Sequence, residues 1–341
     1  MTKLLEIKDK VIKFYSKNET YAKPVLKFLG CIVVYFVISN NIGYNSKVSS
    51  IPVILVLSLA GCLLPIGATT FLASIVILLN LYALSAEVAM IGAVIFLLIL
   101  VIYYRFSSKA GIMALATPVL LKLNVPYIVP VGTALLKKPY AIIPSLCGTV
   151  VYFFLHGVKL SASTLSSDKV VEGEETAKYT VSVNQLVANK EMYLYLGIFI
   201  VAAVAVYLIR RSKIDHAWTI ATIVGILIQV LGFFVGFLSF GTMDKLLGMI
   251  LGNIVCFLIG FVIQFFFMNL DYARTERVQF EDDEYYYYVK AVPKKMVASK
   301  EVSVKRFGNT SVMAKKVKPV KEEQDEEFDF NDIKIFEDLD E

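Results

Sequence analysis

The chain has 341 residues, of which 57% are hydrophobic and 18% charged, and its mean hydropathy is +0.66. This composition excludes an ordinary soluble globular protein. The charges are segregated, because the net charge is +10 up to Leu270 and −5 from Asp271 onward. The sequence therefore predicts an all-α polytopic membrane domain at 28–270, followed by a cytoplasmic charged tail at 271–341.

The first element is a basic amphipathic N-terminal segment, residues 1–27. It contains seven lysines, and its apolar residues recur at helical spacing. This pattern is typical of a helix that lies on a membrane surface, and a solvated leader helix is the alternative. A first span is expected at 28–41, and it should remain as an anchor because no small-residue cleavage site follows it.

The next apolar run, Val48 to Ala86, contains 39 uncharged residues and is interrupted by Pro65 and Gly67. It is too long for one span. The interruption predicts either two short spans or a hairpin of half-helices. Glu87 then precedes a span at 88–104. This carboxylate is either a proton carrier or a loop residue between two spans.

Residues 110–139 form a second broken segment, in which two apolar stretches of about twelve residues meet at Lys122 and Asn124. Each stretch reaches roughly 18 Å, against a hydrocarbon core of roughly 30 Å. Five of the ten prolines lie between Pro118 and Pro144. We expect a re-entrant hairpin or two short crossings. At the apex of a hairpin, Lys122 would need an anion or water; otherwise it lies among the external headgroups.

Four further spans are expected at about 140–156, 192–209, 217–241 and 246–270, with an extracytoplasmic polar loop at 158–191. The total is about eight transmembrane helices plus one re-entrant or short-helix hairpin. The distribution of lysine and arginine places both termini in the cytoplasm, with the protein in the plasma (inner) membrane.

The residues that usually carry enzyme chemistry do not cluster in this sequence. Cys31, Cys62, Cys147 and Cys256 lie in apolar runs without CxxC spacing, which favours buried hydrophobic residues over disulfides or metal ligands. His156 and His216 are expected at opposite ends of the membrane domain. We therefore expect no metal site, no cofactor and no enzyme activity.

The charged tail has three predicted parts. Residues 277–293 contain two strand-like runs around an acidic turn, and 302–307 is a candidate third strand, with a disordered tyrosine run as the alternative. Residues 290–321 are basic and suited to anionic lipid. Residues 322–341 alternate acidic and hydrophobic residues, which is typical of docking to a cytosolic protein, and neutralisation of the basic stretch before them is the alternative. No nucleic-acid module is present, so no nucleic-acid partner is expected.

The strongest functional indication is the pair of broken segments, which would enter the membrane from opposite sides. This arrangement predicts a transporter or permease-like protein with a site between them; ordinary helices kinked by proline are the alternative. The main rival function is a membrane scaffold or regulator that recruits a cytosolic partner through its tail. A subunit that works with a partner ATPase, or a homo-oligomer, is a further possibility. The predicted substrate-binding residues are Lys122, Asn124, Pro65, Gly67, Pro130, Gly132 and Glu87.

Overall fold

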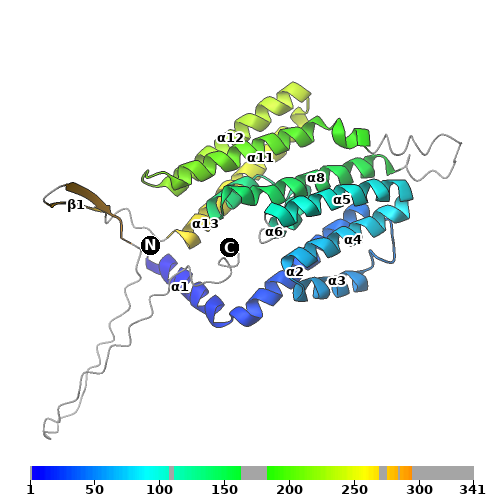
Figure 1. The fold of residues 1–341 in the computed structure, drawn as a ribbon, viewed down its shortest axis with the longest axis horizontal. Coiled ribbons are helices and arrows are strands. Elements are labelled where there is room, and N and C mark those ends of the chain that lie inside the picture. Colours follow the sequence, from blue (N-terminus) through cyan, green and yellow to red (C-terminus); the bar gives the residue numbers. More distant parts are fainter. Residues whose placement is uncertain (1, 107–110, 163–182, 269–274, 283–284, 294–341) are drawn as a thin grey trace, which may run out of the picture.

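In the computed structural model the protein is a helical bundle with a small β-hairpin beyond one end (Figure 1). The structure describes residues 2–106, 111–162, 183–268, 275–282 and 285–293. The helices are α1 (Thr2–Lys17), α2 (Glu19–Ile42), α3 (Ile51–Leu63), α4 (Ile66–Leu84), α5 (Ala86–Phe106), α6 (Gly111–Lys122), α7 (Ile128–Leu136), α8 (Ile142–Leu160), α11 (Lys190–Arg211), α12 (Ala217–Phe240) and α13 (Leu246–Phe267). Short 3-10 turns, Pro139–Ala141 and Met243–Lys245, precede α8 and α13, and the strands are β1 (Glu276–Glu281) and β2 (Tyr286–Ala291).

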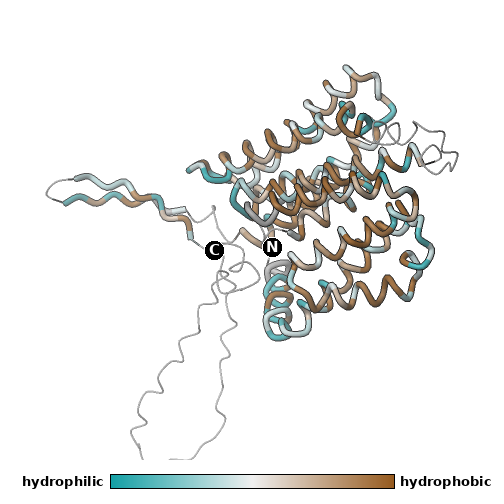
Figure 2. Tube along the Cα trace, turned by 45° about the vertical axis from the view of Figure 1, so that its right-hand side comes forward, coloured by the Kyte–Doolittle hydropathy of each residue, from teal (hydrophilic) through white to brown (hydrophobic). Residues whose placement is uncertain are grey.

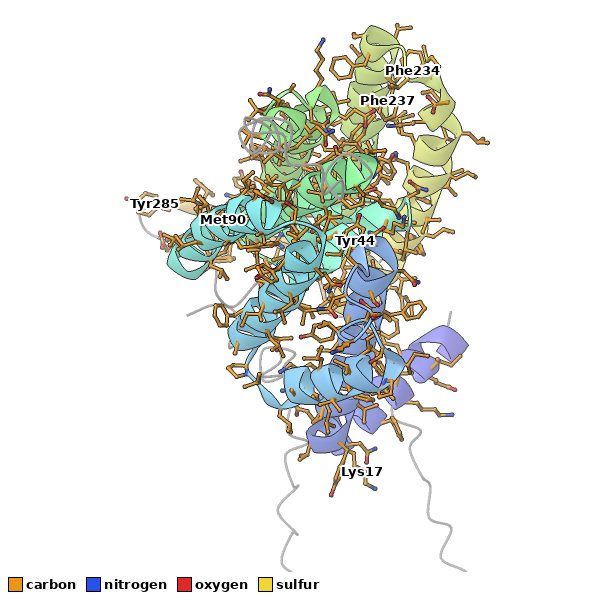
Figure 3. All side chains as sticks on the ribbon, turned by 90° about the vertical axis from the view of Figure 1, so that its right-hand side faces the viewer. Lys17, Tyr44, Met90, Phe234, Phe237 and Tyr285 are labelled. Atoms are coloured by element: carbon orange, nitrogen blue, oxygen red, sulfur yellow. The ribbon has the colours of Figure 1, made fainter. Side chains whose placement is uncertain are left out.

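Within the described chain, six helices are long and apolar enough to cross a membrane: α2, α4, α8 with its preceding turn, α11, α12 and α13. Hydrophobic residues cover most of their length (Figure 2), and large apolar side chains such as Met90 and Phe234 project outward (Figure 3). These features indicate an integral membrane protein. Helices α3 and α6, and the apolar part of α5 at Ala86–Ile102, are shorter. The expected count of eight crossing helices is therefore not confirmed.

The two ends of the bundle carry different elements. At the first, Lys8 of α1 donates a hydrogen bond to the carbonyl oxygen of Phe265, near the end of α13, at 2.9 Å. We call this the N-terminal end. At the other, Ile42 at the end of α2, Val88 at the start of α5 and Val158 near the end of α8 share one apolar cluster. We call this the opposite end.

Helices α3 and α4 form a first hairpin, whose base lies at the opposite end. The backbone N–H of Asn45 and the hydroxyl of Ser49, both before α3, donate to the side-chain oxygen of Asn80 near the end of α4, each at 3.2 Å. The tip is at Pro65, which begins α4 without a free N–H. The interruption predicted at Pro65 and Gly67 is therefore a turn between α3, which is shorter than a span, and α4, which is long enough to cross a membrane.

A lysine from α2 caps the tip of this first hairpin. The ammonium of Lys27 donates to the carbonyl oxygen of Cys62 at 3.1 Å and to that of Leu64. These carbonyls belong to the end of α3, where no further helical N–H is available. A positive charge also interacts favourably with the negative end of the helix dipole.

This contact leads to a stability prediction. Replacement of Lys27 by methionine should lower the free energy of unfolding by about 1.5 kcal/mol, the low end for a hydrogen bond to a charged group, because Lys27 is only half-buried. Lys23, one turn away, is the matched control. Its ion pair with Glu19 is solvent-exposed, so Lys23→Met should cost no more than about 0.5 kcal/mol. Equal melting temperatures of the two variants in detergent would contradict the assignment.

Helices α6 and α7 are joined by a tight turn, and we call this pair the second hairpin, although the two helices pack mainly against other helices rather than against each other. Asn124 lies at its tip with a left-handed φ of 57°, a conformation that asparagine adopts more readily than most residues. The thiol of Cys256 in α13 donates to the carbonyl oxygen of Tyr127 at the tip, at 3.3 Å. At the base, the guanidinium of Arg210 donates to the carbonyl oxygen of Leu135. The hairpin is therefore fastened by α13 at its tip and by α11 at its base.

The base of this second hairpin lies at the N-terminal end. Lys245, just before α13, pairs with Glu191 at the start of α11 at 2.5 Å, so α11 and α13 run in the same direction. Arg210 at the end of α11 is therefore at the N-terminal end, with the end of α13. The two hairpins thus have their tips at opposite ends of the bundle.

The second hairpin also joins the two halves of the bundle. Helix α6 packs against α2, α4 and α8, whereas α7 packs against α8, α11, α12 and α13. Residues Ile128 to Leu135 of α7 are all buried. A helix of nine residues spans only about 14 Å, and such interrupted backbone is tolerated at membrane depth where protein covers it.

The small β element predicted in the tail is confirmed. Strands β1 and β2 pair antiparallel, with Val278 opposite Val289, and the rings of Phe280 and Tyr287 stack at 4.9 Å between centroids. The described side chains of both strands are exposed. The predicted third strand at 302–307, the acidic segment and most of the basic segment lie outside the described residues, as does the middle of the polar loop.

Candidate functional site

A cavity lies where the two hairpins meet, between α4 of the first and α6 of the second. Helices α2, α5 and α8 complete its wall. Its volume is about 70 Å³. The lining residues are Val34, Val37, Ile38, Asn41, Thr70, Ala73, Ser74, Ile77, Phe96, Ile99, Leu100, Ala114, Leu115, Pro118, Val119, Cys147, Gly148, Val151, Tyr152 and Leu155.

The polar groups of this cavity are neutral. They come from Asn41, Thr70, Ser74 and Tyr152, and the described residues of the lining include no charged side chain. The Thr70 hydroxyl donates to the carbonyl oxygen of Ile66 at 3.0 Å, and the Ser74 hydroxyl donates to that of Thr70 at 3.1 Å. With their protons directed to the helix backbone, these hydroxyl oxygens offer lone pairs to a hydrogen-bond donor.

A proline adds a backbone acceptor beside the cavity. Pro118 lies inside α6 and has no N–H to donate to the carbonyl of Ala114, four residues earlier. The same carbonyl oxygen faces α8, since a Cβ placed on Gly148 would lie 2.7 Å from it. All three residues line the cavity. The cavity therefore combines apolar walls with a few oxygen acceptors.

The size of the cavity limits what it can hold. A cavity needs about 10–15 Å³ of space to hold one water molecule, so 70 Å³ suits a few waters or one small solute. Sites for drug-sized ligands are typically about 300–1,000 Å³. A larger solute would require the helices to move apart.

The structure places the seven predicted site residues in four separate positions, and none is in the lining of this cavity. Pro65 and Gly67 lie at the tip of the first hairpin, and Lys122 and Asn124 are exposed at the tip of the second. Glu87 is in the first turn of α5 and accepts a hydrogen bond from the Ser85 hydroxyl.

The last two predicted residues, Pro130 and Gly132, are buried in α7. A Cβ on Gly132 would meet Ile263 of α13 at 3.8 Å, so this position packs toward the half of the bundle formed by α11 to α13. The predicted residues thus lie as three separate pairs and the single residue Glu87, and the structure does not bring them together in one site.

Lys122 is the last residue of α6 and is exposed at the tip of the second hairpin. The choice between its two predicted positions, a deep apex and the headgroup level, stays a prediction. The tip itself contacts α13 at Gly252, roughly 9 Å along the helix from its first residue.

The cysteines and histidines lie largely as predicted. Cys31, Cys147 and Cys256 are buried and Cys62 is half-buried, and all four are free thiols. His156 is at the opposite end, whereas His216 precedes α12 at the N-terminal end. In the described ranges, no group of three or more His, Cys, Asp or Glu residues has the arrangement of a metal site.

Sequence reasoning missed the residues that line the cavity. The available signals were the proline inside α6 and the small polar residues Thr70 and Ser74, which share one face of an otherwise apolar helix. Chemically, the arrangement can enclose a small neutral solute and offer it hydrogen-bond acceptors. Comparisons of the chain with protein-family models, with curated protein sequences and with solved structures gave no match.

Proposed function

We propose that the protein is an integral membrane transporter or permease-like protein, and that its solute passes through the cavity between the hairpins. The observation that carries this proposal is that one wall comes from α4 and another from α6, which belong to hairpins with tips at opposite ends. Such inverted elements can rock against each other and open a central site to one side at a time.

The proposed solute is small and neutral. A charged solute would have to leave water for a wall without a compensating charge, which costs several kcal/mol. The hydroxyl oxygens of Thr70 and Ser74 and the carbonyl of Ala114 suit a solute that carries N–H or O–H donors. Polyols and small amides meet these requirements.

In this proposal four of the predicted site residues act at the tips of the hairpins, whereas Pro130 and Gly132 are buried in α7 and Glu87 is in α5. Pro65 and Gly67 allow the first tip to bend, and Lys122 and Asn124 lie where solute would enter at the opposite end. Because Lys8, Lys27 and Arg210 all lie toward the N-terminal end, we propose that this end faces the cytoplasm of a plasma membrane, together with both termini.

The native thiol of Cys147 provides the test, because it lines the cavity. A variant that keeps only this cysteine (C31A, C62S, C256S) is reconstituted into sealed vesicles and treated from either side with a small membrane-impermeant methanethiosulfonate. We expect modification from both sides, since alternating access exposes the cavity to each in turn.

A variant that keeps only Cys256 is the matched control. Cys256 is fully buried in the cluster around α7 and does not line the cavity, so it should react slowly from both sides. If Cys147 reacts no faster than Cys256, the transporter proposal fails.

The scaffold function is the second candidate, and the exposed β-hairpin favours it. Val278, Phe280, Tyr287 and Val289 leave an uncovered apolar surface at the N-terminal end. Under this alternative, Phe280→Ala with Tyr287→Ala would abolish co-purification of a specific cytosolic protein, and Cys147 would be inaccessible. Binding of anionic lipid by 290–321, docking through 322–341, and association with an ATPase or a second copy remain predictions.

A further inference from the structure

One side of helix α1 is fastened to the bundle. Lys8 is only 4% exposed; its ammonium donates to the carbonyl oxygen of Phe265 and lies 5.6 Å from the centroid of that ring. Ile12 and Tyr15, which follow Lys8 by four and seven residues, are half-buried on the same side. On this side Lys8 therefore fastens α1 to the end of α13.

A second side of α1 carries an uncovered apolar stripe. Ile7, Val11 and Phe14 are 54%, 47% and 70% exposed. Their spacing of four and three residues places them in one row along the helix. Large apolar side chains in such a row are costly to leave in water, since burial of each is worth about 1.5–3 kcal/mol.

A row of lysines runs beside the stripe. Lys10, Lys13 and Lys17 have the same spacing of three and four residues, and all are exposed. Lys17 projects away from the helices at the edge of the molecule (Figure 3). An apolar row flanked by cations is the pattern of helices that lie in the surface of anionic membranes.

We propose that α1 docks along this stripe into the headgroup layer of an anionic lipid leaflet. Helix α1 turns sharply into α2 (Figure 1), a helix of membrane-spanning length, so the bilayer lies directly beside it. The lysines meet the lipid phosphates while the apolar row enters the acyl boundary. Because Lys8 binds the end of α13, the docked helix braces α13. This inference is independent of the transporter proposal.

The test measures where the stripe lies in the full chain. A cysteine is introduced by Phe14→Cys in a Cys62→Ser background and labelled with bimane. The protein is then reconstituted into vesicles of pure phosphatidylcholine, or of phosphatidylcholine in which about one third of the lipid is phosphatidylglycerol. Quenching by nitroxide lipid reports contact with the bilayer, and quenching by iodide reports contact with water. A label at Tyr285→Cys, on the exposed β-hairpin, is the aqueous control.

In anionic vesicles we expect the label at position 14 to be quenched by nitroxide lipid and protected from iodide. Lysine near an anionic surface contributes about fivefold each to the ratio of docked to detached helix. In pure phosphatidylcholine the ratio of docked to detached helix should therefore fall by roughly a hundredfold. In anionic vesicles the same fall is expected for the triple variant Lys10→Gln, Lys13→Gln and Lys17→Gln.

Two results would overturn the inference. In the first, the label at position 14 is as accessible to iodide as the label at position 285, which means that the stripe lies in water. In the second, quenching by nitroxide lipid is equal in the two lipid compositions, which means that lipid charge has no part in docking. The comparison of lipids uses the native lysines, so it stands even if the triple variant misfolds.

Discussion

Replacement of Gly252 by alanine should lower the stability of the protein by about 1–3 kcal/mol, the usual cost of overpacking. A Cβ at this position would lie 2.5 Å from the ring of Tyr127 and 2.7 Å from the backbone oxygen of Asn124. Neither can yield easily, because Tyr127 is 3% exposed and the oxygen belongs to the tip of the second hairpin. We expect the melting temperature in detergent to fall.

Gly248, one turn earlier in the same helix, is the matched control. A Cβ there would meet nothing within 4 Å, and alanine is favoured over glycine in a helix by about 1 kcal/mol. Gly248→Ala should therefore leave the melting temperature unchanged or raise it. If the two variants are equally stable, the tip of the second hairpin is not packed against α13 as described.

Replacement of Ser74 by leucine should abolish solute passage without unfolding the protein. Ser74 lines the cavity, so the larger side chain occupies the space that we assign to the solute. Filling a cavity commonly stabilises a protein, so the melting temperature should stay the same or rise. The measurement is the osmotic swelling of proteoliposomes in urea and in glycerol, which should fall to the rate of protein-free liposomes.

Ser239 offers the same change outside the cavity. Its hydroxyl also donates to the carbonyl four residues earlier, at 2.8 Å, but the residue is exposed on α12. Proteoliposomes that contain Ser239→Leu should therefore swell at the same rate as those that contain the unmodified protein. If proteoliposomes with Ser74→Leu swell at that same rate, the cavity is not the path of the solute. If proteoliposomes with the unmodified protein swell only as fast as protein-free liposomes, the protein does not transport small neutral solutes.

Local sequence patterns predict much of this fold. The breaks at Pro65 and in the segment from Pro118 to Pro144 are visible because proline lacks the N–H that a continuing helix uses. Their exact places are not, since Pro118, Pro130 and Pro144 lie inside α6, α7 and α8. The apolar stretches beside Lys122 are visibly too short to span. The alternation around the acidic turn predicts the β-hairpin, and the exclusion of an ordinary soluble fold needs only composition.

The number of crossing helices is less accessible to sequence reasoning. A long apolar run such as Val48 to Ala86 has the same composition whether it crosses twice or folds back, because lipid and a protein interior are both apolar. The start of the first long helix also differs from the prediction. The sequence predicts a span at 28–41, whereas α2 begins at Glu19 and runs through Pro24. Hydropathy therefore locates apolar helices better than it counts crossings.

The choice of site residues shows the same limit. Sequence reasoning selects charged residues such as Lys122 and Glu87 as site candidates because they are unusual in an apolar run. The cavity is instead lined by residues that are ordinary one at a time, such as Ser74, Val119 and Gly148. They form a site only because α4, α6 and α8 present them to one another.

Composition, charge segregation and helix-breaking residues thus suffice to predict a helical membrane domain, two interrupted segments and a polar tail, since each depends on neighbours along the chain. The meeting of the hairpins at one cavity and the capping of helix ends by Lys8, Lys27 and Arg210 depend on residues far apart in sequence. Lys8 and Phe265, for example, are 257 positions apart. Such contacts follow from how the helices pack, because an unsatisfied carbonyl is capped by whichever cation the packed bundle brings to it.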